Sequence, residues 1–279
     1  MEERKIKNGW VFTLIFSVIA LVFVSPIFIV LMNSFKSKAF INLTPFELPT
    51  EATFVGAENY INGIDKIGFF EALFNSLFIT VGSTLVIVLC TSMCAWYIAR
   101  VSNKFTKTFY YLCVFSMIVP FQMVMFTLSL IADRLGLTNP LGIIIVYLGF
   151  GAGLAVFMFT GFVKGIPLEI EEAAMIDGCN PINTFFKVVL PILKPTCITV
   201  AILQAMWIWN DYLLPYLVLD QRRYKTIPIA IQYLKGGYGS VDWGAMMAML
   251  VLSIIPIIIF YSICQKYIIK GVVAGAVKG

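Results

Sequence analysis

The residues that could do chemistry lie near the end of a long apolar segment, where Gln204, Trp207 and Asp211 follow one another on one face of a predicted helix. A carboxylate, an amide and an aromatic ring suit a neutral sugar, which needs paired hydrogen bonds and a flat apolar surface. Polar side chains within membrane-spanning segments are costly and often mark a substrate path. Asn210 and Gln122 are further candidates. A structural role, in which Asn210 and Asp211 tie spans together or cap a broken helix, is the alternative.

A second polar region is the stretch EEAAMIDGCNPINTFFKVVLP, from Glu171 to Pro191. Pro167 can begin a helix just before it, because the missing N–H costs nothing in the first turn. The helix dipole favours anions there, and the predicted first turns contain Glu169, Glu171 and Glu172. Ala173 and Ala174 leave part of this helix without bulk, so acids and a bare patch together favour docking into a groove on a partner protein.

The same stretch contains the signals for a turn and a second helix. Gly178 suits a left-handed helix end, and Asn180–Pro181 is typical of an N-cap followed by the first helical residue. We expect the second helix to end at Pro191 and Pro195. The result would be a hairpin of two short helices, neither long enough to cross a bilayer.

The elements that must position these residues are membrane-spanning helices. The chain has 279 residues, of which 60% are hydrophobic and 13% charged, whereas soluble domains carry about 25% charged residues. The fold class is therefore all-α integral membrane, with the hairpin between spans four and five. Six apolar stretches are long enough to cross about 30 Å of hydrocarbon, and they run roughly over 10–32, 73–97, 109–131, 141–163, 198–219 and 244–264. The first lacks an A-x-A cleavage site and is expected to remain as a span.

Orientation follows from the basic residues. With a cytoplasmic N-terminus, most of the 20 Lys and Arg residues fall on the cytoplasmic side, which predicts that both termini and the hairpin are cytoplasmic. The outer loop 33–72 contains ENYINGIDKIGFFEAL, whose spacing predicts a short helix along the membrane surface. In the outer loop 220–243, KGGYGS is either a plain connector or a contact for an extracellular partner.

Several kinds of chemistry find no support in the sequence. The chain has no His, and its six Cys residues read as small apolar side chains rather than as a disulfide framework or a metal site. The dipeptide Gly-Lys does not occur, so the chain lacks a phosphate-binding loop of the G-x-x-x-x-G-K-[ST] type. No catalytic constellation and no basic stripe for nucleic acid is present. We therefore expect neither an enzyme nor a nucleic-acid-binding protein.

The hairpin carries a recognisable pattern. Glu172-Ala173-Ala174, then Gly178, then Val188-x-Leu190-Pro191 resembles the EAA loop of the permease subunits of binding-protein-dependent ABC importers. Three further stretches extend the resemblance. NSLFIT at 75–80 resembles the start of this family's permease core, and WNDYLLP at 209–215 resembles the fifth-span signature of its carbohydrate-uptake subgroup. The tail QKYIIKGVVAGAVKG at 265–279 resembles the maltose-transporter-type second permease of that subgroup. The matched parts run from about residue 58 to the end.

The resemblance implies a role for each part. The first helix of the hairpin would be the coupling helix, seated in a cleft of a cytoplasmic ATPase. The motif positions implied in this coupling are Glu172, Ala173, Ala174, Asp177, Gly178, Leu190 and Pro191. Residues 1–72 would form an N-terminal span and extracellular loop, and 73–279 the permease core, with the EAA loop at 164–197 and a C-terminal tail at 265–279 that reaches toward the ATPases.

The resemblance also implies partners. They are a second homologous permease, two cytoplasmic ATPase subunits that bind ATP and Mg²⁺, and an extracellular solute-binding protein that delivers a sugar or oligosaccharide. The chain itself would need no cofactor and would lie among the lipids of a bacterial cytoplasmic membrane. Two alternatives remain: an importer of glycerol phosphate or another polyol derivative, and an ion-coupled secondary transporter that uses Asp211.

Overall fold

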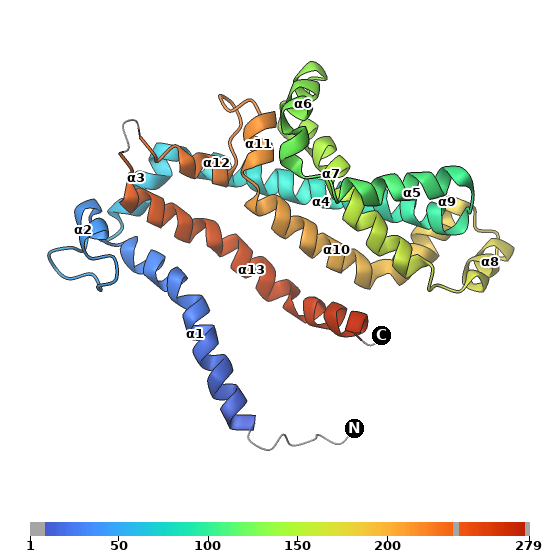
Figure 1. Cartoon of the computed structure of the whole chain (residues 1–279), viewed down its shortest axis with the longest axis horizontal. Helices are drawn as coiled ribbons and strands as arrows, with labels where there is room; N and C mark the ends of the chain where they lie inside the picture. Colours follow the sequence, from blue (N-terminus) through green and yellow to red (C-terminus); the bar gives the residue numbers. More distant parts are fainter. Residues whose placement is uncertain (1–8, 237–239, 277–279) are drawn as a thin grey trace. The chain divides into compact units, whose positions relative to one another are not determined.

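The computed structural model describes residues 9–236 and 240–276, with side chains described as far as Tyr267 (Figure 1). The last part of the predicted tail and the middle of KGGYGS therefore lie outside the described residues. The chain divides into two compact units, one within 1–70 and 230–256 and the other within 71–229 and 257–279. In the described part, helices account for the regular structure, apart from two isolated bridges. This confirms the all-α class.

The first unit contains a long apolar helix and several short ones. Its helices are α1 (Gly9–Asn33), α2 (Lys38–Leu43), α3 (Glu58–Ile67) and the beginning of α13 (Trp243–Ala276). α1 is apolar on all sides and exposed along nearly its whole length, as expected of a helix that meets lipid. α3 is the short helix predicted after residue 57, and it ends at Gly68, whose φ of 62° is left-handed.

Close approaches around α3 organise this unit. The Asn59 amide donates hydrogen bonds of 2.8 Å to the carbonyl oxygens of Ser34 and Lys36. Gly63 packs against α13 so closely that an added Cβ would lie 2.7 Å from the terminal methyl of Met249. A side chain at position 63 would therefore push the two helices apart.

An ion pair lies at the start of α13. Lys66, in the last turn of α3, contacts the carboxylate of Asp242 just before α13 begins. Burial acts to raise the pKa of Asp242, but hydrogen bonds from Lys66 and from the Ala245 N–H, together with the Lys66 charge, hold this pKa below its usual range. The carboxylate therefore remains ionised in all but acidic solution.

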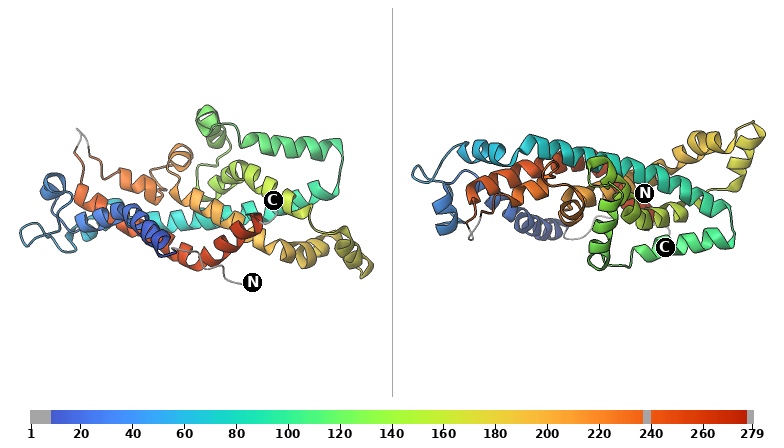
Figure 2. Two further views of the ribbon diagram at one scale, coloured as in Figure 1. Left: turned by 60° about the horizontal axis from the view of Figure 1, so that its bottom comes forward. Right: turned by 90° about the horizontal axis from the view of Figure 1, so that it is seen from above.

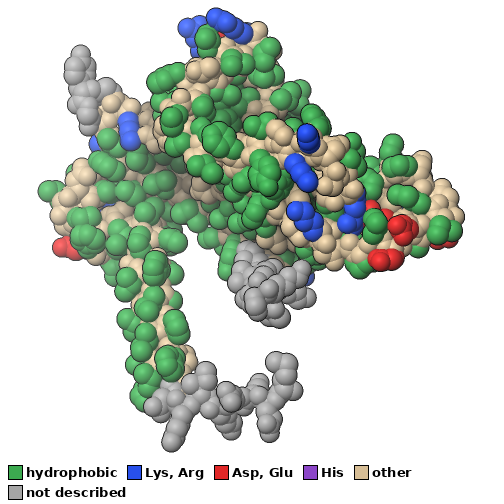
Figure 3. All heavy atoms as spheres, turned by 45° about the vertical axis from the view of Figure 1, so that its right-hand side comes forward, with side chains coloured by type: hydrophobic (Ala, Val, Ile, Leu, Met, Phe, Trp, Pro, Cys, Tyr) green, Lys and Arg blue, Asp and Glu red, His purple; other side chains and the backbone are tan. Residues whose placement is uncertain are grey.

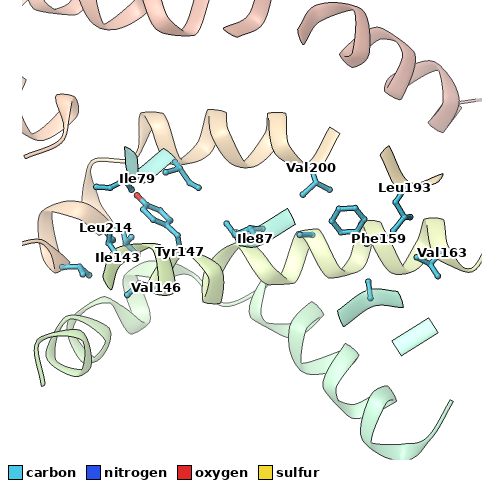
Figure 4. Close-up of a cluster of buried hydrophobic side chains, with 14 of the residues drawn as sticks. Ile79, Ile87, Ile143, Val146, Tyr147, Phe159, Val163, Leu193, Val200 and Leu214 are labelled. Carbon is cyan, nitrogen blue, oxygen red and sulfur yellow. The ribbon is translucent and has the colours of Figure 1, made fainter. Parts of the chain in front are cut away.

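The second unit contains the remaining helices. They are α4 (Phe69–Arg100), α5 (Lys104–Ser116), α6 (Phe121–Arg134), α7 (Pro140–Val163), α8 (Leu168–Ile176), α9 (Pro181–Thr184), the π-helix η1 (Phe185–Val189), α10 (Leu190–Asn210), α11 (Leu213–Val218) and α12 (Ile227–Gln232), which begins here. α7 packs against α5 and α10. Apolar side chains of α4, α7 and α10 meet in one core, including Ile87, Phe159 and Val200 (Figure 4).

The predicted spans are found with two exceptions. By length and composition, five described helices could cross a membrane: α1, α4, α7, Pro181–Asn210 and Trp243–Tyr267. The predicted third span, 109–131, is wrong as a continuous helix, because it is broken into α5 and α6 at an angle of 108° (Figure 2). The cause is Pro120, which supplies no N–H and disfavours helical backbone at the residue before it. The pair counts as a sixth span only if it crosses as a bent element.

The predicted ends around the fifth span are also wrong. The helix after the turn does not stop at Pro191 and Pro195 but runs on as a 30-residue helix, Pro181–Asn210. It tolerates Pro191 because this residue stands in the first turn of α10, after a π-helical turn in which the Leu190 N–H bonds to the Phe185 carbonyl. At the other end, helical structure stops at Asn210 instead of continuing to residue 219, and α11 begins separately.

Candidate functional site

The first helix and the turn of the hairpin form as the local signals predict, but the prediction of a short second helix is wrong, because Pro181–Asn210 is long enough to cross a membrane. α8 begins directly after Pro167 and ends at Ile176. Gly178 has a φ of 86°, in the left-handed region where glycine carries no steric penalty. The Asn180 side chain accepts a hydrogen bond of 2.8 Å from the Asn183 N–H and so caps α9. The turn geometry is thus set by glycine and asparagine.

The predicted coupling positions are not all on the surface. Five of the seven are exposed: Glu172, Ala173, Asp177, Gly178 and Pro191. Ala174 is buried and Leu190 is half-buried. The expected bare patch of two alanines is therefore reduced to Ala173, because Ala174 occupies the inward face of α8.

The exposed face of the hairpin mixes acids with large apolar side chains. Figure 3 shows acidic side chains gathered where α8 lies. The exposed apolar residues of the hairpin include Leu168, Ile170, Met175, Ile176 and Ile182, and Ile176 is 86% exposed. Apolar surface bordered by charge is typical of a protein–protein contact. This face can therefore bind a partner with an apolar cleft and basic groups.

Glu171 is a functional candidate that the sequence analysis missed. Its carboxylate is buried, and Oε1 accepts hydrogen bonds from Nε and Nη2 of Arg100, at 2.9 and 2.7 Å. Trp96 donates from Nε1 to the other oxygen, Oε2, at 2.9 Å. α8 is thereby fixed to the last turns of α4.

A sequence signal for this cluster existed. Trp96 and Arg100 stand four residues apart, so they share one face of α4 and can serve one partner. The Trp96 ring also packs on Phe185 of η1, with ring centroids 5.6 Å apart. Glu172 is the acid that belongs to the motif, whereas the neighbouring Glu171 makes these contacts.

Asp211 caps a helix at the other end of α10. Its Oδ1 accepts hydrogen bonds from the backbone N–H groups of Leu213 and Leu214, at 3.0 and 3.3 Å. Its Oδ2 accepts one from the Tyr147 hydroxyl at 3.1 Å. The structural interpretation of Asp211 as the cap of a broken helix therefore has direct geometric support, and contact with substrate stays a prediction.

The predicted polar stripe is only partly assembled. Tyr147, which the sequence analysis did not single out, contacts Asp211 and also packs edge-on against Trp207, with centroids 5.4 Å apart. Gln204 is buried and donates from Nε2 to the Gly151 carbonyl at 3.2 Å, which ties α10 to α7. Its Oε1 has no hydrogen-bond partner within the described structure.

The remaining candidates for a substrate path are exposed. Trp207 is exposed in the last turns of α10, and Asn210 beside it donates to the Met206 carbonyl at 2.7 Å. Gln122 is exposed in the first turn of α6. Trp207 and Asn210 lie near each other in sequence on α10, whereas Gln122 is on a different helix. Their part in transport stays a prediction.

Comparison with known proteins places these features in a family. A 39% identical relative is described as a probable starch degradation products transport system permease protein AmyC of Thermoanaerobacterium thermosulfurigenes, with 94% of each chain covered. The multiple sugar-binding transport system permease protein MsmG of Streptococcus mutans is 35% identical, with 99% of each chain covered. The melibiose/raffinose/stachyose import permease protein MelC of Bacillus subtilis is 30% identical over the full length of both.

The fold has a counterpart among solved structures. A chain of a bacterial ABC transporter involved in the import of the acidic polysaccharide alginate matches with a TM-score of 0.79 at 24% identity, with 96% of this chain and 99% of that chain covered. The family model for the binding-protein-dependent transport system inner membrane component matches residues 87–273, which include the hairpin and Asp211. The chain therefore belongs to the family of membrane-embedded permease components of binding-protein-dependent ABC transport systems.

Proposed function

We propose that this chain is one of two permease subunits of an ATP-driven importer that carries a sugar or oligosaccharide across the bacterial cytoplasmic membrane by alternating access. The observation that carries the proposal is the protruding hairpin with its exposed acids and apolar side chains, in a chain whose relatives are described as permeases for sugars. An extracellular solute-binding protein would deliver the sugar.

In this proposal α8 is the coupling helix. Glu172 and Asp177 pair with basic groups around a cleft of an ATPase subunit, and the exposed Ile176 enters the cleft. Two ATPase subunits bind ATP and Mg²⁺ and carry out hydrolysis, so the chain needs no cofactor of its own. Both termini and the hairpin are cytoplasmic, as the distribution of Lys and Arg favours.

The sugar would meet the exposed residues at the end of α10. Trp207 offers an aromatic face and Asn210 an amide, and Gln122 offers a second amide. None of these side chains is basic, which favours a neutral sugar over a phosphate-bearing substrate. Asp211 already accepts hydrogen bonds from three donors, which disfavours its use as the ion site of a secondary transporter.

Copurification from the native membrane tests the proposal. The tagged chain is extracted in mild detergent and its companions are identified, for the wild type and for Glu172→Lys. We expect a second permease and an ATPase with the wild type, and loss of the ATPase from the variant because a cation would face basic groups. Glu71→Lys, at an exposed acid in the first turn of α4, is the matched control and should retain the ATPase.

Two outcomes would contradict the proposal. One is a chain that emerges without an ATPase, and the other is sugar uptake by the chain alone that follows an ion gradient. The second outcome would direct attention to Asp211 instead of the hairpin.

A further inference from the structure

The contact between α8 and α4 uses all the acceptor atoms of one buried carboxylate. The Glu171 side chain is 2% exposed and the Arg100 side chain 18%. Oε1 of Glu171 is bound by two nitrogen atoms of the guanidinium group and Oε2 by the Trp96 indole N–H. Hydrogen bonds to a charged group are strong and directional, so a carboxylate held at both oxygens by two side chains of one helix has a defined orientation. α8 is therefore held to α4 at a fixed angle as well as at a fixed distance.

Stability alone gives a poor account of this arrangement. A buried ion pair loses hydration that its mutual attraction only partly offsets, and apolar residues of similar size often stabilise a fold as well or better. A small helix such as α8 could be attached through Ala174 and apolar neighbours. What the charged contact adds is a geometry that an apolar contact, which has no preferred direction, does not supply.

The same end of α4 also holds the chain on both sides of α8. Arg100 donates from Nη2 to the Ile166 carbonyl at 3.0 Å, in the segment between α7 and α8. Trp96 packs on Phe185 of η1, which follows the turn. The base of the hairpin is thus fixed to α4 before, within and after α8. α4 is 32 residues long and ends at Arg100, and its Ile79 and Ile87 lie in the core of the unit.

We propose that Glu171, through Arg100 and Trp96, is a positioning residue that transmits movement of α8 to α4 and thereby to the helices around the substrate path. This rests on the proposed function, in which α8 is moved by the ATPases. Glu172, on the exposed side of α8, serves the partner; Glu171, on the buried side, serves the permease. Movement of α8 without this contact would be taken up within the hairpin instead of reaching the spans.

The test uses the whole importer, with both permeases and the ATPases, reconstituted in liposomes with its binding protein and sugar. Sugar taken up and ATP hydrolysed are measured together for the wild type, Glu171→Gln and Glu71→Gln. Glu171→Gln keeps the size of the side chain but removes the charge that Arg100 binds. Glu71→Gln makes the same chemical change at an exposed acid outside the hairpin, in the first turn of α4.

We expect the Glu171→Gln complex to assemble with its ATPases, because the exposed face of α8 is unchanged, but to import about tenfold less sugar per ATP, a typical size for coupling between sites. Glu71→Gln should match the wild type. If Glu171 only supported the fold, the yield of complex and its uptake would fall together while sugar per ATP stayed constant, and that result would overturn the inference.

A milder variant covers the case in which Glu171→Gln does not assemble. Trp96→Phe removes the indole N–H but keeps a ring against Phe185, so it should lower sugar per ATP by a smaller factor without loss of complex. An unchanged ratio in Trp96→Phe would then overturn the inference. A wild-type complex without ATP-dependent sugar uptake would overturn the proposed function and the inference with it, whereas a coupled wild type with unaffected variants would overturn the inference alone.

Discussion

A carboxylate lies near each end of the Pro181–Asn210 helix, and the two carboxylates are bound differently. At the hairpin end, Glu171 is bound by the charged guanidinium of Arg100 and by Trp96. At the other end, Asp211 is bound by the neutral Tyr147 hydroxyl and by two backbone N–H groups of α11. The first contact joins two helices through an ion pair, and the second ends one helix and begins another.

The two kinds of contact predict different tolerance to substitution. Removing one member of a buried ion pair leaves an uncompensated charge in the interior. Removing a neutral donor from Asp211 leaves the carboxylate with its other partners and a half-exposed position. We therefore expect the hairpin end to be more sensitive to substitution than the Asp211 end.

The largest effect on stability is expected from Arg100→Met. It leaves the buried Glu171 carboxylate without its cation and should lower the free energy of unfolding by about 3–5 kcal/mol. Thermal unfolding of the purified protein in detergent, followed by Trp fluorescence, measures the change. The double variant Glu171→Met with Arg100→Met should recover most of the loss, since no charge is then left unpaired, and simple addition of the two single losses would argue against a coupled pair.

A smaller loss of stability is expected at the turn of the hairpin. At a φ of 86°, Gly178→Val should cost about 1–3 kcal/mol of backbone strain, although an added Cβ would meet no atom within 4 Å. Because the strain would reorient α8, we expect ATP-driven sugar uptake to be lost while the chain still folds. Gly178→Asn is the matched control, because Asn tolerates left-handed backbone. Normal uptake by the Val variant would show that the orientation of α8 does not matter.

At the Asp211 end, Tyr147→Phe should have a modest effect. It removes the hydroxyl that donates to Asp211 but retains the ring that packs on Trp207, so the expected loss is about 0.5–1.5 kcal/mol. The same thermal assay measures it, with Tyr216→Phe, at an exposed tyrosine of α11, as the control. A loss as large as that of Arg100→Met would remove the contrast between the two ends.

A third carboxylate, Asp242 in the first unit, is expected to contribute least to the free energy of unfolding. Its pKa is held below the ordinary value of 3.8 in the folded state, so the ion pair with Lys66 stabilises the fold fully above that value. The contribution is lost as the pH falls through the lower, folded-state pKa. For an exposed pair we expect about 0.2–1 kcal/mol. Unfolding midpoints compared between neutral and acidic pH should shift less in Lys66→Met than in the wild type, and equal shifts would contradict the assignment.

The sequence predicts the class of fold and most of the helices, because long apolar segments and cap residues are local signals. Gly178 and Asn180 predict the hairpin turn for this reason and take the expected positions, whereas Pro167 lies one residue before the helix that it is expected to begin. The effect of proline on helix continuity is predicted wrongly at two positions. Pro120 breaks a segment that hydropathy predicts to be one span. Pro191 does not end the helix that it is predicted to end, because a π-helical turn allows the helix to continue past it.

The candidate site could be predicted less well, since its contacts join distant segments. Glu171 and Glu172 are neighbours of the same type, and only the packing of α8 on α4 decides which is buried. In the same way, nothing in the sequence of α7 distinguishes Tyr147 from its apolar neighbours. Its contacts with Asp211 and Trp207 arise only when α7 packs on α10. Spacing along one helix does not contain this information.

The π-helical turn η1 has a mechanical consequence. The backbone hydrogen bonds around it are fewer and irregular. Pro191 and Pro195 supply no amide hydrogen, and the Leu190 N–H bonds to the carbonyl five residues earlier instead of four. Bending stiffness of a helix comes largely from its regular ladder of hydrogen bonds, so an applied torque concentrates its curvature at this point. The Pro181–Asn210 helix is therefore expected to bend most easily at η1. Its tilt can change there while the Glu171 contact holds α8 in place.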